Sequence, residues 1–327
     1  MRLSISRVGL LARMTAISLT AMVLFIAVVV FYNIMMGHPG SDFENNTNSV
    51  VFAETGYYGG NSENILQLII QDAHYYFWLG VLSSIFDDPV LILRGITIFL
   101  IIMLVYPVAF QAGQLKNKVL LFPILFVLFM HPRFLDLVLG NIRSGTALVI
   151  FLYALRVKSV KIRNLLLITA PTFHLGVSAL LLLYIAYLNL KKFLVRWSHP
   201  QVVTFFLAIG PSILIVIAKG LFPGRGISSW EGGMAYTLGV LLITFYTFFI
   251  GRHYVSEKYV FMSLGMISLV AWGALLDYST MRYFSFFFPC FAMAILKYHR
   301  TPQILLLTLV GFGSFTLVSH STWLLSI

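Results

Sequence analysis

Long apolar runs recur along the whole chain, and short clusters of basic residues separate them. Of the 327 residues, 59% are hydrophobic and only 10% are charged, whereas a soluble domain carries about 25% charged residues. An α-helix needs about 20 apolar residues to cross the hydrocarbon core of a bilayer. The sequence therefore predicts an all-α polytopic membrane protein in which residues 1–327 form a single integral membrane domain.

The distribution of the 22 Lys and Arg residues predicts how the chain crosses the membrane. Basic residues concentrate in cytoplasmic loops, so an even number of crossings should separate each cluster from the next. This condition gives about nine to eleven transmembrane helices with a cytoplasmic N-terminus. The same basic loops account for the net charge of +11, so we expect no nucleic-acid partner. Sixteen of the basic residues fall in six clusters, at positions 2–13, 116–118, 156–163, 191–196, 252–258 and 297–300.

Two apolar segments break this parity if each is read as an ordinary span. Residues 64–88 carry several polar side chains before their apolar half, including Asp72 and His74, so we expect an interfacial helix on the outer side. Residues 164–190 lie between two basic clusters and are too long for one span but too short for two. We expect a re-entrant or broken helix there, interrupted near Pro171 in "APTFH".

Six basic residues fall on the outer side of this arrangement, which tends to be depleted of positive charge. For Arg94 and Lys219, snorkelling from a helix end and a functional role are equally good explanations. Arg143 lies within the predicted span 134–155, too deep to snorkel easily, and this position predicts a functional role. The other three are Arg133, Arg225 and Arg282.

Arg143 and His174 are expected at similar depth on consecutive membrane segments. Counted from the basic cluster at 156–163, Arg143 lies about 20 Å and His174 about 16 Å above the inner surface. Asn141 adds a polar side chain beside the arginine, and the flanking glycines leave room for a helix or a ligand. Asp136 shares the predicted helix face, but at about 10 Å it could orient the guanidinium only through a third group.

An arginine and a histidine in one outward-facing cavity suit a transfer reaction on a polyprenyl-diphosphate lipid. The guanidinium binds phosphate through paired donors, and histidine exchanges a proton near neutral pH. We expect Arg143 to hold the diphosphate and His174 to take a proton from the attacking hydroxyl. The alternative for His174 is a helix-breaking residue that hydrogen-bonds a freed carbonyl. No acidic cluster has metal-ligand spacing, so we expect no metal and no cofactor.

Five further residues are candidates for contacts with the substrate. Arg282 opens an aromatic-rich helix, where it would reach a lipid phosphate or act as an interface anchor. Arg225 lies in a glycine-rich outer loop able to close over a sugar, and Arg133 lies just after the turn "HP". Asp72 and His74 lie on the interfacial helix, where a structural role is the alternative.

The segments "NIRSGTALVIFLYAL" and "LLLITAPTFHLGVSALLLL", joined by a basic loop, resemble the EpsG-like polysaccharide polymerases, relatives of the Wzy O-antigen polymerases. In that family an N-x-R element precedes a short cytosolic loop and a helix with a histidine next to small residues. A later helix carries an arginine among aromatic residues, as "MRYFSFFFP" does in this chain. The family often has glutamine after the motif arginine, where this chain has Ser144.

The resemblance implies a glycosyltransferase of the bacterial inner membrane with its active site facing the periplasm. It would polymerise undecaprenyl-diphosphate-linked oligosaccharide repeat units into O-antigen or a related surface polysaccharide. By position, Arg143 and His174 would be central and Arg282 would be a second phosphate contact. The implied partners are undecaprenyl-diphosphate-linked glycans, membrane lipids and a chain-length regulator protein.

Two other functions would use similar residues. A flippase or transporter of lipid-linked oligosaccharides would bind the same diphosphate, but it would have two related halves and polar residues toward both leaflets. A membrane O-acyltransferase would use His174 as a base on an acyl donor, with its donor-binding charges toward the cytoplasm. The crowding of polar residues on the outer side favours the polymerase.

Overall fold

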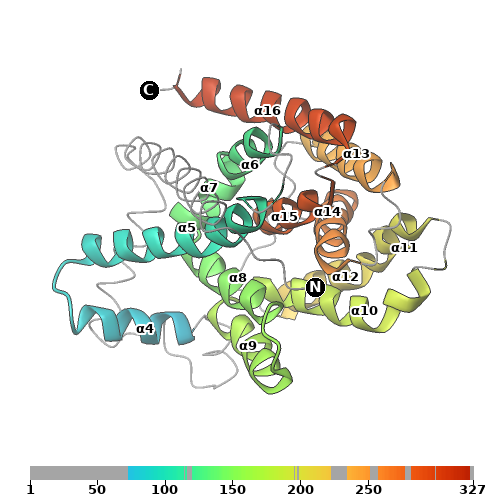
Figure 1. Ribbon diagram of the computed structural model, residues 1–327. Helices are drawn as coiled ribbons and strands as arrows, with labels where there is room; N and C mark the ends of the chain where they lie inside the picture. The colour runs from blue at the N-terminus through green and yellow to red at the C-terminus, as the bar shows by residue number, and fades with distance from the viewer. Residues whose placement is uncertain are drawn as a thin grey trace, which may run out of the picture. The chain divides into compact units, whose positions relative to one another are not determined.

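All regular structure in the described part of the chain is helical (Figure 1). The computed structural model describes residues 73–113, 115, 120–194, 196, 199–221, 234–250, 257–276, 281–298 and 300–324. Within these ranges three helices are long and apolar enough to cross a membrane, Pro89–Ala112, Leu175–Leu194 and Lys258–Leu275. The all-helical prediction is confirmed for these residues, whereas the number of nine to eleven spans stays a prediction.

The chain divides into two compact units. The first contains the described residues up to Met103 together with Leu135–Leu182, and we call it the α8–α9 unit. The second contains Leu104–Phe134 and the described residues from Leu183 onward, and we call it the α14–α15 unit. Three helices pass from one unit to the other: α5 (Pro89–Gly113), α7 (Pro132–Leu139) and α10 (Ser178–Leu194).

The α8–α9 unit is built on a helical hairpin. α8 (Ile142–Ala154) packs against α9 (Val160–Phe173) along its length, and the short turn at 155–159 makes the two helices antiparallel (Figure 1). α4 (Ala73–Ser83) packs on α9, and the 3-10 turn η1 (Leu175–Val177) packs on α8. α4 lies within the predicted interfacial segment 64–88, of which residues 64–72 are outside the described part.

The predicted span 134–155 is not one continuous helix, because it is interrupted in its middle. α7 ends at Leu139 and α8 begins at Ile142, with a turn at Gly140 and a non-helical Asn141 between them (φ −101°, ψ 54°). Glycine and asparagine favour turns over helix interiors, which explains the position of the break. Asp136 therefore does not share a helix face with Arg143, since the helical register is lost between them.

The segment 164–190 is also broken, within the predicted stretch "APTFH". α9 continues through Pro171 to Phe173, and His174 is extended (φ −161°, ψ 120°) before η1 and α10 begin. Pro171 removes the N–H that would have bonded the carbonyl of Leu167, which weakens the last turn of α9. The predicted interruption is therefore present, and it lies at the histidine itself.

The α14–α15 unit has an apolar and aromatic core. α14 (Lys258–Leu275) is buried along nearly its whole length and packs beside α15 (Met281–Ile295) (Figure 1). A helix that is apolar on every side is stable only when other helices surround it. Besides α15, α14 packs against α11 (Pro200–Leu207), α12 (Ile209–Leu221) and α13 (Met234–Ile250). α6 (Leu121–Phe129) and η3 (Leu296–Tyr298) pack on α15, and α16 (Pro302–Leu324) packs on α6, α13 and η3.

Phenylalanine rings fill the space between α15 and its neighbours. The rings of Phe287 and Phe291 stack with centroids 4.9 Å apart, and Phe312 of α16 packs 5.5 Å from Phe291. Elsewhere in the unit, the indole N–H of Trp272 donates to the carbonyl of Phe205 at 2.8 Å. These contacts join α11, α14, α15 and α16 into one unit.

Candidate functional site

Arg143 lies in the first turn of α8 and contacts α4. Its Nη1 donates a hydrogen bond to the hydroxyl of Tyr76 at 3.2 Å, and its Cζ lies 5.8 Å from the centroid of the Tyr76 ring. The two residues are 67 positions apart in the sequence, and both are partly buried. The guanidinium is thus held at a defined place against α4 rather than extended freely.

The N-terminus of α8 adds backbone donors beside this arginine. The first intrahelical bond runs from the N–H of Gly145 to the carbonyl of Asn141 at 3.1 Å, so the N–H groups of residues 142–144 precede it and have no intrahelical acceptor. Asn141 lies at the capping position, but its side chain makes no capping hydrogen bond. Helix N-termini favour anions, and the guanidinium of Arg143 adds a full positive charge.

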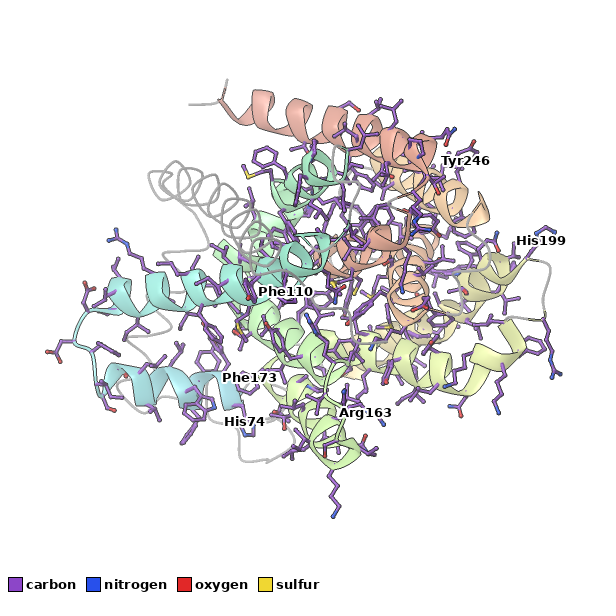
Figure 2. The ribbon with its side chains drawn as sticks, viewed as in Figure 1. His74, Phe110, Arg163, Phe173, His199 and Tyr246 are labelled. Atoms are coloured by element: carbon purple, nitrogen blue, oxygen red, sulfur yellow. The ribbon has the colours of Figure 1, made fainter. Side chains whose placement is uncertain are left out.

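α4 also contacts the end of α9. The imidazole of His74 stacks on the ring of Phe173 with centroids 5.7 Å apart and an interplanar angle of 26° (Figure 2). Only one residue separates His74 from Tyr76, so this short helix contacts both members of the hairpin. The predicted interfacial helix therefore packs against the arginine and histidine segments.

His174 directly follows Phe173 at the break between α9 and η1. Its N–H donates to the carbonyl of Ala170 at 3.4 Å, and its carbonyl accepts from the N–H of Val177 at 3.2 Å. Since α8 and α9 are antiparallel, the start of α8 and the end of α9 lie at the same end of the hairpin. Arg143 and His174, both partly exposed, therefore belong to the same end of one unit.

The other predicted site residues are distributed differently. Arg133 belongs to the α14–α15 unit, and so does Arg282, the second residue of α15. Asp136 lies on α7, and neither its side chain nor that of Arg282 is among those described. Asp72 and Arg225 lie outside the described residues. Within the described ranges, no three His, Cys, Asp or Glu residues are grouped so that they could hold a metal ion.

Sequence reasoning missed three residues that contact predicted site residues. Tyr76 lies in the predicted interfacial helix, two positions after His74. Phe173 lies in the predicted break "APTFH", directly before His174. The third is His131, which is buried and stacks on Phe288 at 4.1 Å. Its Nδ1 accepts a hydrogen bond from the N–H of Arg133 at 3.2 Å.

No protein-family model, no curated protein sequence and no solved structure matches this chain. The fold and the site by themselves define an all-helical protein with helices long and apolar enough to cross a membrane. In the α8–α9 unit, Arg143, Tyr76, His74 and His174 belong to one end of the hairpin.

Proposed function

We propose that this protein is a glycosyltransferase of the bacterial inner membrane that polymerises undecaprenyl-diphosphate-linked oligosaccharide repeat units on the periplasmic side. The observation that carries the proposal is the co-occurrence of Arg143, the uncapped first turn of α8 and His174 at one end of the hairpin. Transfer of a sugar from a diphosphate needs a cationic group for the leaving anion and a base for the incoming hydroxyl.

Arg143 would hold the diphosphate of the glycan donor. Its planar fork offers paired donors to phosphate oxygens, and the N–H groups of the first turn of α8 would add further donors. Tyr76 would act as a positioning residue, because its hydroxyl accepts a hydrogen bond from Nη1 of Arg143. The charge that develops on the leaving diphosphate would then meet donors that are already in place.

His174 would serve as the general base. One ring nitrogen would take the proton from a hydroxyl of the acceptor sugar, whose oxygen forms a new bond to C1 of the donor glycan. The bond between C1 and the phosphate oxygen breaks, and undecaprenyl diphosphate leaves with the electron pair. The imidazolium then releases its proton to water. Contacts of Arg282, Arg133 and Arg225 with phosphate or sugar stay predictions from the sequence.

Deletion of the gene in its host tests this assignment against its rivals. A polymerase mutant should carry single repeat units on its surface glycolipid and no ladder of longer chains. Loss of all surface glycan would instead indicate a flippase, and full-length glycan lacking acyl groups would indicate an O-acyltransferase. Either of these results would overturn the proposal.

Complementation of the deletion connects the phenotype to the site. Arg143→Ala and His174→Ala should each fail to restore the ladder at wild-type protein levels in the membrane. Arg300→Ala is the control, because it also removes one arginine but lies just before α16, in the other unit. Normal ladders from both site variants would contradict the assignment.

A further inference from the structure

The opposite end of the α8–α9 hairpin carries a concentrated positive charge. Four basic residues lie within eight positions around the turn that joins the two helices: Arg156, Lys158, Lys161 and Arg163. The first three are exposed, and none of the four forms an ion pair with a described residue. Arg163, labelled in Figure 2, is partly buried, and its Nε is buried without a hydrogen-bond partner in the described part.

The first turn of α9 has unused backbone donors at the same place. Ser159 occupies the capping position, but its side chain makes no capping hydrogen bond. The first intrahelical bond is from the N–H of Arg163 to the carbonyl of Ser159 at 2.9 Å. The N–H groups of residues 160–162 therefore have no intrahelical acceptor, and they add to the attraction for an anion.

Exposed apolar side chains continue directly from this charge along α9. Lys161, Leu165 and Ile168 follow the spacing i, i+4, i+7 and so lie on one face of the helix. Leu165 is 63% exposed and Ile168 is 70% exposed. The charged Lys161 and the exposed apolar Leu165 and Ile168 thus lie within about 10 Å of one another along one face of α9.

We propose that this face binds a phospholipid with an anionic headgroup. The phosphate would lie between Lys158, Lys161 and the first turn of α9, and an acyl chain would lie along Leu165 and Ile168. An anionic protein or a nucleic acid carries negative charge that complements the basic cluster, but it has no acyl chain to cover Leu165 and Ile168. A phospholipid has both an anionic headgroup and an acyl chain. The site lies about 20 Å along α8 from Arg143, so it is separate from the proposed diphosphate site.

Lipid binding to the detergent-solubilised full-length protein tests this proposal without reference to enzymatic activity. Native mass spectrometry would compare phosphatidylglycerol with phosphatidylcholine of the same acyl chains. The wild-type protein should bind phosphatidylglycerol at least tenfold more tightly. Lys158→Ala/Lys161→Ala should lower that affinity about 25-fold, because each basic residue near an anionic lipid contributes about a factor of five.

The matched control removes the same charge from another helix end. Lys191 and Lys192 are both exposed in the last turn of α10, and Lys191→Ala/Lys192→Ala should change the affinity less than twofold. A second variant, Leu165→Ala/Ile168→Ala, should weaken binding of long-chain phosphatidylglycerol and leave that of a soluble short-chain analogue unchanged.

Three results would overturn the proposal. The first is equal affinity of the wild-type protein for the two headgroups. The second is an equal loss of affinity in the two lysine double variants, which would show a general effect of charge. The third is displacement of the lipid by millimolar inorganic phosphate, which would show a phosphate site with no role for the apolar face.

Discussion

The guanidinium of Arg143 on α8 donates a hydrogen bond to the hydroxyl of Tyr76 on α4, across a distance of 3.2 Å. This contact links the arginine that breaks the apolar pattern of the sequence to a helix whose own pattern indicates an interfacial position. It gives the guanidinium a fixed orientation at the N-terminus of α8. Changes at either residue should therefore affect the same step of the proposed reaction.

Tyr76→Phe keeps the aromatic ring and removes only the acceptor of this hydrogen bond. We expect kcat/KM for chain extension to fall about tenfold, with little change in thermal stability, because a misplaced guanidinium costs about 1.4 kcal/mol of transition-state stabilisation. Tyr246→Phe is the control, since Tyr246 is an exposed tyrosine of the other unit (Figure 2). Equal activity of the two variants would remove the positioning role from Tyr76.

Arg143→Lys tests whether the geometry of the guanidinium matters as well as its charge. Lysine keeps one positive charge but offers no planar pair of donors. We expect Arg143→Lys to lose about tenfold in kcat and Arg143→Ala about 10²–10³-fold, the range seen when one donor to a developing anion is removed. Steady-state kinetics with purified lipid-linked repeat units would measure kcat of both variants. Full activity of the alanine variant would exclude the proposed role.

Gly145→Ala tests the close packing of α8 against α7. An added Cβ would lie 2.7 Å from the carbonyl oxygen of Leu137 and 3.0 Å from Cδ1 of Leu100, so the two helices would have to separate. We expect the free energy of unfolding to fall by about 1–3 kcal/mol, as in other overpacked interiors.

The control for this variant is Gly95→Ala on α5, where nothing lies within 4 Å of the added atom. Alanine is the better helix former, so Gly95→Ala should leave stability unchanged or raise it by up to about 1 kcal/mol. Melting temperatures in one detergent would compare the two variants. A Gly145→Ala protein as stable as Gly95→Ala would contradict the close approach.

His131 should stabilise the turn between α6 and α7 through two separate contacts. Its Nδ1 accepts from the N–H of Arg133, and its ring stacks on Phe288. His131→Ala loses both contacts and should lower the free energy of unfolding by about 1–3 kcal/mol. His131→Asn can keep a side-chain acceptor for the N–H of Arg133, and His131→Phe can keep the stacking on Phe288. Each of these variants should therefore be more stable than His131→Ala. Denaturant unfolding would measure the stability of all three variants. Equal losses of stability in the three would contradict the presence of two independent contacts.

The helical class of the fold was predictable from the sequence, because long apolar runs leave few other solutions in a bilayer. The apolar runs at 234–250, 259–276 and 282–296 predict three spans, and α13, α14 and α15 match them to within one residue at each end. Charged or glycine-rich sequences flank these runs and mark their ends. The break at Asn141 was not predicted. The apolar pattern continues across it, and hydropathy does not register the turn preference of two adjacent residues.

The candidate site was partly predictable. Arg143 and His174 were singled out by their polarity, and they occur at the same end of one hairpin. Tyr76 could not be found in this way, because tyrosine is common at membrane interfaces and its partner lies 67 residues away. Likewise, Asp136 was placed beside Arg143 by helical spacing alone, and that argument fails once the helix is broken.

The proposed reaction is tested most directly by chain extension in proteoliposomes that contain the purified protein and lipid-linked repeat units. Wild-type protein should produce a ladder of glycans and release one undecaprenyl diphosphate for each bond formed. His174→Ala should extend chains about 10²–10⁴-fold more slowly, while His199→Ala, at an exposed histidine before α11, should match the wild type (Figure 2). A ladder formed at the wild-type rate by His174→Ala would contradict the account.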